Sequence, residues 1–103
     1  MIARVWRGRS TIAQADGYER HAKEMVFPSL RGIPGHRGAY LLRRETDGGI
    51  EFLVLTLWDS IEAVRGFAGE DVESAVVEPQ ARAVLEDFDR FVRHFDVVHG
   101  PDL

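Results

Sequence analysis

The chain has 103 residues, 45% of them hydrophobic and 29% charged, which is typical of one globular domain and not of a disordered or fibrous protein. Its formal net charge of -4 provides no basic field for a nucleic-acid backbone, and its lack of cysteine excludes disulfides, thiolate metal sites and cysteine nucleophiles. No apolar run approaches the length of a membrane span, and the first residues contain no long apolar signal region. We therefore expect a soluble, cytoplasmic protein with neither nucleic acid nor membrane as a partner.

The first quarter of the chain predicts a strand followed by a helix. Residues 2–9 mix apolar and polar side chains as a strand does, and Thr11 and Gln14 have the spacing of a helix-starting capping box. Apolar side chains then recur on one helical face, at Ala15, Tyr18, Ala22, Met25 and Val26. Pro28 is expected to end or kink this helix.

Two further strands are predicted over residues 37–46 and 50–59. Asp47, Gly48 and Gly49 lie between them and tolerate positive φ, so the pair forms a hairpin. The pattern leaves open whether two or three residues make the turn. The choice matters because a one-residue slip in pairing exchanges the two faces of a strand.

The second half predicts helical segments and a closing strand. A helix begins at Asp59 or Ser60, with the spacing of Asp59 and Glu62 resembling a cap, and Gly69 ends it. The apolar residues at 72, 75 and 76 indicate another helical turn, and Pro79 suits the first position of a further helix. A strand over residues 91–98 ends a last segment that spans 88–99.

This order, β-α-β-β-α-β, predicts an α+β protein of the ferredoxin-like, split βαβ type with a four-stranded antiparallel sheet. We expect a single domain over residues 1–99 and a short tail over 100–103.

The third strand is apolar on both faces between residues 52 and 58, interrupted only by Thr56. Helices can cover one set of side chains, and the other, either Leu53, Leu55 and Leu57 or Phe52, Val54 and Trp58, would remain in water. A contiguous apolar patch invites association, and sheet-to-sheet packing about a two-fold axis closes it. The sequence therefore predicts a homodimer. The alternative is a monomer in which a loop covers the second face.

Two residues on the last strand are candidates for proton transfer. His94 and Asp96 lie two positions apart and therefore on one face of a strand. A histidine oriented by a carboxylate can accept a proton from a phenolic substrate. The alternative is a structural histidine, hydrogen-bonded at a dimer interface.

Five further residues are candidates for binding a ligand. Arg4 shares a strand face with Ile2 and Trp6, so it either pairs with an acid, Asp96 or Glu45, or anchors an anionic ligand. Three aromatic residues suit the wall of a pocket for a planar molecule, although core packing is the alternative, above all for the last of them: Trp6, Tyr40 and Trp58. His36 lies either near a pocket mouth or on an exposed loop. No spacing of metal-ligating residues is present, so no metal is expected.

Four segments of the sequence resemble the antibiotic biosynthesis monooxygenase superfamily of dimeric α/β barrels. They are residues 1–8, 34–38 and 92–98 and, most specifically, the run Leu57-Trp58-Asp59-Ser60-Ile61-Glu62-Ala63. The resemblance covers nearly the whole chain and implies a ligand pocket between the sheet and the helices. Some members oxidise polyketide-derived phenols with molecular oxygen and no cofactor, others degrade haem, and many have no assigned substrate.

The haem-degrading branch of that superfamily carries an asparagine on the first strand, a tryptophan on the second helical region and a histidine on the next helix. The nearest positions in this chain are Arg7 or Gly8, Phe67 and Val77, none of which matches. Since valine cannot ligate iron, the resemblance does not imply haem degradation here.

The leading hypothesis is therefore a cofactor-independent monooxygenase for a small quinol- or anthrone-like aromatic. In it His94 acts as base or orienter, and Trp6 and Tyr40 frame the ring. Two alternatives stay open on the same scaffold. One is a non-enzymatic, ligand-binding or stress-associated dimer, and the other is a decarboxylase or isomerase that moves a proton without consuming oxygen.

Overall fold

The chain forms five strands and a set of short helices in the computed structural model, which describes residues 1–101. Residues 102 and 103 of the predicted tail lie outside the described residues. The elements, in chain order, are β1 (Ile2–Thr11), α1 (Ile12–His21), the π-helical turn η1 (Ala22–Val26), α2 (Phe27–Leu30), β2 (His36–Thr46), β3 (Gly49–Trp58), α3 (Ile61–Ala68), α4 (Pro79–Val84), β4 (Asp87–Phe88) and β5 (Arg93–Asp96). None of the helices within the described range is long and apolar enough to cross a membrane.

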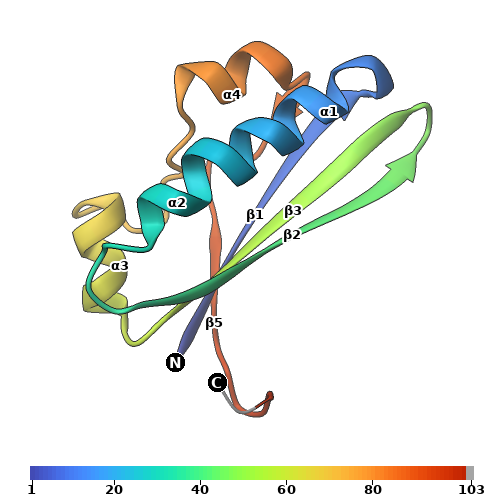
Figure 1. The fold of residues 1–103 in the computed structure, drawn as a ribbon. Helices are drawn as coiled ribbons and strands as arrows, with labels where there is room; N and C mark the ends of the chain where they lie inside the picture. Colours follow the sequence, from blue (N-terminus) through green and yellow to red (C-terminus); the bar gives the residue numbers. More distant parts are fainter. Residues whose placement is uncertain (102–103) are drawn as a thin grey trace.

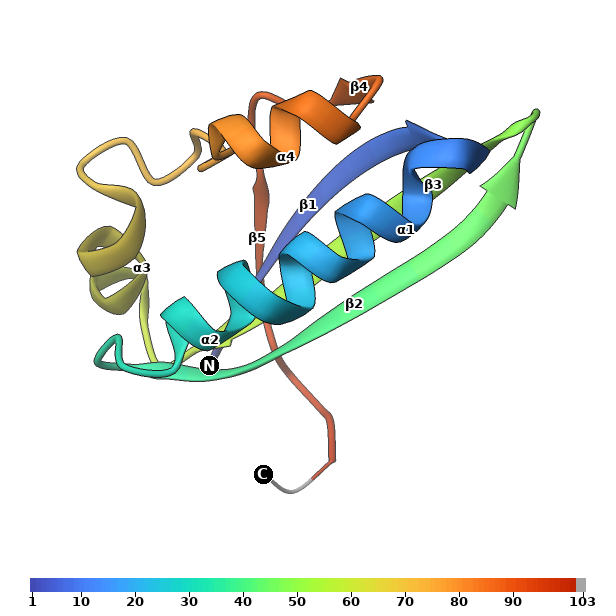
Figure 2. The same ribbon diagram turned by 45° about the horizontal axis from the view of Figure 1, so that its top comes forward.

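The strands form one antiparallel sheet in the order β2-β3-β1-β4, with β5 also paired to β1. β4 pairs with Gly8 and Arg9, whereas β5 pairs with residues 2–5, so the two short strands share one edge of β1. The sheet is thus four strand positions wide. The helices all lie over one of its faces (Figures 1 and 2). This is the predicted α+β, ferredoxin-like arrangement, which is confirmed.

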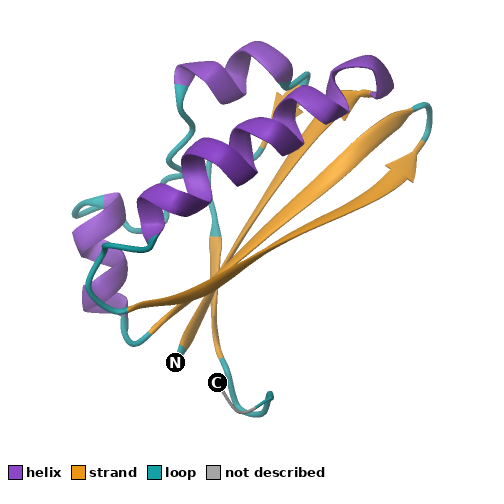
Figure 3. Ribbon diagram, in the orientation of Figure 1, coloured by secondary structure: helices purple, strands orange, loops and turns teal. Residues whose placement is uncertain are grey.

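The last strand is shorter than predicted and is interrupted. The chain between β4 and β5 is drawn as a loop (Figure 3). Its residues 90–92 pair with residues 73–75 and not with β1. Ala75 N–H donates to the carbonyl of Arg90, and Val92 N–H donates to that of Glu73. These bonds satisfy backbone groups that a continuous strand would have given to β1.

The hairpin between β2 and β3 has a two-residue turn. Thr46 pairs with Gly49, and the turn residues Asp47 and Gly48 have φ angles of 41° and 77°, as a type I′ turn requires. This register settles which face is covered. Phe52 and Trp58 are buried under the helices, whereas Leu53, Leu55 and Leu57 lie on the opposite, outer face of the sheet.

The first helix begins as predicted and continues through Pro28 by widening its turn. Thr11 accepts a hydrogen bond from Gln14 N–H at the start. In a regular α-helix Pro28 would lack an N–H donor and would clash with the carbonyl four residues earlier. A π turn lies directly before it, in which Phe27 N–H donates to the carbonyl of Ala22. The wider turn also rotates the helix, so Met25, predicted on the buried face, is exposed.

Two local predictions in the second half are corrected. Ser60, not Asp59, caps α3 by accepting a hydrogen bond from Ala63 N–H. The predicted helical turn over residues 72–76 is a loop. Two of its carbonyls accept from Arg4 on β1, the carbonyl of Glu73 accepts from Val92 N–H, and Ala75 N–H donates to the carbonyl of Arg90. Gly69 ends α3, and Pro79 begins α4, both as predicted.

Replacing Gly35 by alanine should destabilise the fold by about 2 kcal/mol or more, measured by urea unfolding. Gly35 has a φ of +85°, and an added Cβ would lie 2.4 Å from the Cβ of Ala63, so strain and a clash both arise. Gly32→Ala is the matched control, since nothing lies within 4 Å of a Cβ there. Equal effects of the two substitutions would contradict this account.

Candidate functional site

A cavity of about 80 Å³ lies between the inner face of the sheet and the helices. Its walls are mostly apolar and aromatic, and its polar members come from five different elements or loops. The residues that line it are Arg4, Trp6, Tyr18, His21, Val26, Phe27, Ser29, Leu30, Val54, Thr56, Phe67, Val76, Val77, Glu78, Ala81 and Val92. Ser29, Val76 and Glu78 are exposed, which places the mouth between α2 and the segment before α4.

Arg4 brings a buried positive charge to this cavity. Its side chain projects from β1 toward the helices and is only 5% exposed. The guanidinium donates to the carbonyls of Val72 at 2.5 Å and Ser74 at 2.9 Å, and one nitrogen lies 3.0 Å from Nε2 of His94. Burial lowers the pKa of Arg4 to about 10, which still leaves it charged at neutral pH.

The charge of Arg4 has no carboxylate partner within the described residues, so neither Asp96 nor Glu45 pairs with it. An arginine side chain has five N–H donors. Three are used in the contacts above, which leaves two without a partner among residues 1–101. A buried cation with unused donors can donate hydrogen bonds to an anionic or strongly polar oxygen of a ligand.

His94 lies beside Arg4 but does not line the cavity. Because a guanidinium can only donate, Nε2 of His94 is the acceptor in this contact and the proton of the neutral ring lies on Nδ1. Burial and the charge of Arg4 both lower the pKa of His94. Asp96 is exposed and forms no hydrogen bond with His94, so the predicted pair does not come together. The geometry gives His94 a role in holding Arg4.

Trp6 lines the cavity next to Arg4, as the sequence suggested. Its indole lies over Gly8, where a Cβ would fall 2.6 Å from the ring, and its Nε1 donates to the carbonyl of Asp89 at 2.9 Å. Tyr18 packs on the other side, with ring centroids 6.2 Å apart. Gly8 and the backbone of Asp89 thus fix the indole as a flat wall.

The other predicted ligand-binding residues lie outside the cavity. Trp58 is fully buried, stacks on Phe67 and donates to the hydroxyl of Thr56, so it supports two residues that do line the cavity. His36 packs edge-on against Trp58, and burial lowers its pKa. Tyr40 is paired with Leu55 and projects from the outer face, because alternate residues of a strand face opposite ways.

Sequence reasoning missed three polar groups of the cavity. His21 is 9% exposed and Tyr18 is 4% exposed, and burial raises the pKa of the tyrosine hydroxyl, which keeps it a hydrogen-bond donor. Thr56 interrupts the apolar run of β3 and turns its side chain inward. The three-residue spacing of Tyr18 and His21 on one helical face was the available signal. Nowhere in residues 1–101 do three His, Asp or Glu side chains gather as a metal ion would need.

Comparison with known proteins assigns the chain to a family. The family described as antibiotic biosynthesis monooxygenase matches residues 1–78, which include Arg4, Trp6, His21 and most of the cavity lining. The chain belongs to this family. No curated protein matches it.

Solved structures share the fold at low sequence identity. A protein of Chloroflexus aurantiacus J-10-fl, provisionally assigned as an antibiotic biosynthesis monooxygenase, is 16% identical, with a TM-score of 0.66 over 98% of this chain and 96% of that one. The haem-degrader MhuD of Mycobacterium tuberculosis, with two haems in its active site, is 21% identical, with a TM-score of 0.63 over 99% and 100% of the two chains. A mutant of MhuD with two manganese protoporphyrins per site is equally similar in fold, at 20% identity. At these identities the likeness establishes the fold alone.

The partly buried His94 should make the protein less stable in mild acid. Since its pKa is lowered in the folded state, the neutral form favours folding, and stability is lost as the pH falls from about 6.5 through the folded-state pKa. His94→Gln keeps an acceptor for Arg4 but cannot titrate. Its free energy of unfolding, measured in urea at pH 7.5 and 5.5, should fall less than that of the wild type.

His36 also contributes to the loss of stability in acid, because burial lowers its pKa. The variant His36→Gln measures how much of the loss comes from His36. An unchanged pH dependence in His94→Gln would contradict the burial of a neutral His94 against Arg4.

Proposed function

We propose that this protein is a cofactor-independent monooxygenase that oxidises a small, electron-rich, quinol-like aromatic in the cavity between sheet and helices. The observation that carries the proposal is an aromatic-walled cavity with a buried, unpaired arginine at one side, in a chain of the antibiotic biosynthesis monooxygenase family. Trp6, Tyr18 and Phe67 offer flat apolar surfaces for a ring.

The main chemical role of the protein in this reaction would be to stabilise the negative charge of the deprotonated substrate. Removal of a phenolic proton yields an anion that can pass an electron to oxygen. In the full reaction the substrate loses two hydrogens and gains one oxygen atom, and the second oxygen atom leaves as water. Arg4 would stabilise the oxyanion because its charge is fixed and largely shielded from water. His94 would hold Arg4 in position, and Asp96 would have no direct part.

The size of the cavity favours one aromatic ring over several. A cavity of roughly 150 Å³ is known to hold benzene, and the cavity in this chain is about 80 Å³, so even one ring is enclosed only in part and must extend into the open mouth. A single-ring quinol bound in this way is a better candidate than a three-ring anthrone.

A haem does not fit this cavity. Pockets for drug-sized ligands measure roughly 300–1,000 Å³, well above the volume present here, and a porphyrin needs a place at the upper end of that range. Val77, which lines the cavity, offers no ligand to iron. The haem chemistry of MhuD is therefore not part of the proposal.

A non-enzymatic ligand-binding protein is the second candidate. The engagement of Nε2 of His94 with Arg4 favours it, because the histidine expected to act as base is not free. Such a protein would bind the same small aromatic without consuming oxygen.

We further propose that the protein is a homodimer that joins its subunits through the outer face of the sheet. This face carries no helix (Figure 1), and side chains near its middle are about half exposed: Tyr40 at 50%, Leu42 at 47% and Phe95 at 53%. Leu53 and Leu55 lie among them and are partly exposed. A patch of this kind on a small domain is best covered by a second copy.

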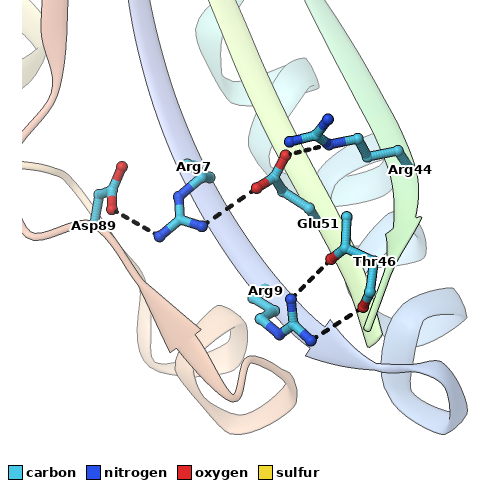
Figure 4. Close-up of polar contacts among 6 residues, drawn as sticks. All are labelled: Arg7, Arg9, Arg44, Thr46, Glu51 and Asp89. Atoms are coloured by element: carbon cyan, nitrogen blue, oxygen red, sulfur yellow. Dashed lines mark hydrogen bonds and ion pairs between the residues drawn. The ribbon is translucent and has the colours of Figure 1, made fainter. Parts of the chain in front are cut away.

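Charged residues delimit this apolar patch at the hairpin end of the sheet. Arg7 lies between Glu51 at 3.3 Å and Asp89 at 3.5 Å, and Arg44 Nε lies 2.7 Å from Glu51 (Figure 4). Arg9 bonds to the side chain and carbonyl of Thr46. These charges are paired within the chain, so a partner could cover the neighbouring apolar patch without desolvating an unpaired ion.

Oxygen uptake with hydroquinone as substrate tests the proposed activity. We expect uptake above the uncatalysed rate in wild type and a loss of more than about tenfold in Ala81→Phe, because the added ring fills the substrate cavity. Ala83→Phe, on the exposed side of the same helix, should keep the wild-type rate. Binding of hydroquinone without any uptake would favour the second candidate.

The dimer is tested by light scattering after gel filtration. Wild type should have twice the 11.6 kDa mass of one chain, and Leu55→Glu should be a folded monomer, because it places a charge in the middle of the outer face. Ile12→Glu, on the exposed side of α1, should stay dimeric. A monomeric wild type would contradict the proposal.

A further inference from the structure

His21 is a titratable group on the cavity wall whose position nothing so far explains. It comes from the end of α1 and is 9% exposed, and its Nε2 is buried with no hydrogen-bond partner in the described part of the chain. A buried polar atom without a partner is costly and calls for an explanation such as a missing ligand. Two nearby groups help to define what that ligand is.

Glu78 lies on the far side of the imidazole, at the mouth of the cavity. Its Oε2 is 3.9 Å from Nε2 of His21, too far for a direct hydrogen bond but close enough to stabilise a positive charge on the ring. The ring of Tyr18 lies 6.5 Å from that of His21, between centroids, and holds it from the sheet side. The imidazole is therefore placed to accept a proton and to carry the resulting charge.

We propose that His21 is the proton acceptor for a small phenol bound in the cavity and that Arg4 binds the second oxygen of the same ligand. The substrate class is thus a single-ring phenol with a second oxygen function, of which hydroquinone is the simplest case. The inference deepens the proposed function and rests on it for the fate of the anion, but the binding and the proton transfer stand without oxygen.

The proton-transfer step is simple to balance. The phenolic O–H bond breaks, its electron pair stays on the oxygen, and the proton forms an N–H bond to Nε2 of His21. The products are a phenolate and an imidazolium, so the total charge does not change. The fixed charge of Arg4 stabilises the phenolate electrostatically, and Glu78 stabilises the imidazolium. Neither an oxidant nor a metal takes part in this step.

The test uses 4-nitrophenol under nitrogen, because the phenol and the phenolate of this probe absorb at different wavelengths. At a pH at which the free probe is mostly protonated, wild type should bind it as the phenolate. His21→Gln fills the same space and can hydrogen-bond but cannot take up a proton. We expect it to bind the probe as the phenol, with an affinity about tenfold lower through loss of the charge pair.

His36→Gln is the matched control, since its Nδ1 is also buried without a partner among residues 1–101, yet it lies outside the cavity. It should leave the spectrum of the bound probe unchanged. Should His21→Gln fail to fold, nitrogen-15 spectra of histidine in wild type report directly whether Nε2 gains a proton when the probe binds.

A phenolate spectrum retained in His21→Gln, an Nε2 that stays unprotonated, or no binding by wild type would each overturn the inference. These outcomes are distinct from failure of the proposed function. Bound phenolate without oxygen uptake would support the role of His21 and reject the oxygenase. Full oxygen uptake in His21→Gln would support the oxygenase and reject His21 as the base.

Discussion

The guanidinium of Arg4 connects parts of the chain that would otherwise have little reason to meet. It lies on β1, bonds to two carbonyls of the loop between α3 and α4, contacts His94 on β5 and lies 5.7 Å from the centre of the Phe67 ring. Each contact offsets part of the free energy that burying a charge requires. Together the contacts hold the loop between α3 and α4, which forms one side of the cavity. The cavity therefore depends on a cation that the fold has left without a counter-ion.

The sheet on which Arg4 lies has two chemically different faces because its side chains alternate in direction. Even-numbered residues of β1 and β3 face the helices, and several of them line the cavity. Odd-numbered residues face outward, where they form the apolar patch and the charged group at its hairpin end. The two-residue turn at Asp47 and Gly48 sets this assignment, because a slip of one residue would exchange the faces. A ligand site and a subunit interface can then occupy the two sides of one thin domain.

Much of the fold could be predicted from the sequence because the signals are local. The cap at Thr11, the Asp-Gly turn, the break at Gly69 and the start at Pro79 act within a few residues of their own positions. The π turn could not be predicted, since the register of a helix after it depends on how the chain accommodates Pro28. The apolar spacing at 72, 75 and 76 is also typical of a helix, but tertiary bonds to Arg4 and to residues 90–92 hold that segment in a non-helical loop.

The candidate site was predicted less completely, because the positions of its residues depend on strand register and on contacts between distant parts of the chain. Arg4 and Trp6 could be found from the faces of a strand, but Tyr40 needed the register to be placed on the outer face. His94 and Asp96 share a strand face as expected, but the ring of His94 contacts the guanidinium of Arg4 and not the carboxylate of Asp96. For His21 the sequence offered only its three-residue spacing from Tyr18, because burial of a single polar residue leaves no other local mark in the sequence.

We propose that the cavity holds one aromatic ring with an oxygen at Arg4. A crystal structure of the protein with hydroquinone, prepared without oxygen, tests this binding mode most directly. We expect the ring to lie between the side chains of Trp6 and Phe67, with one oxygen within hydrogen-bond distance of a free N–H of Arg4. Hydroquinone bound on the outer face of the sheet, or a cavity that stays without it at saturating concentration, would contradict the claim.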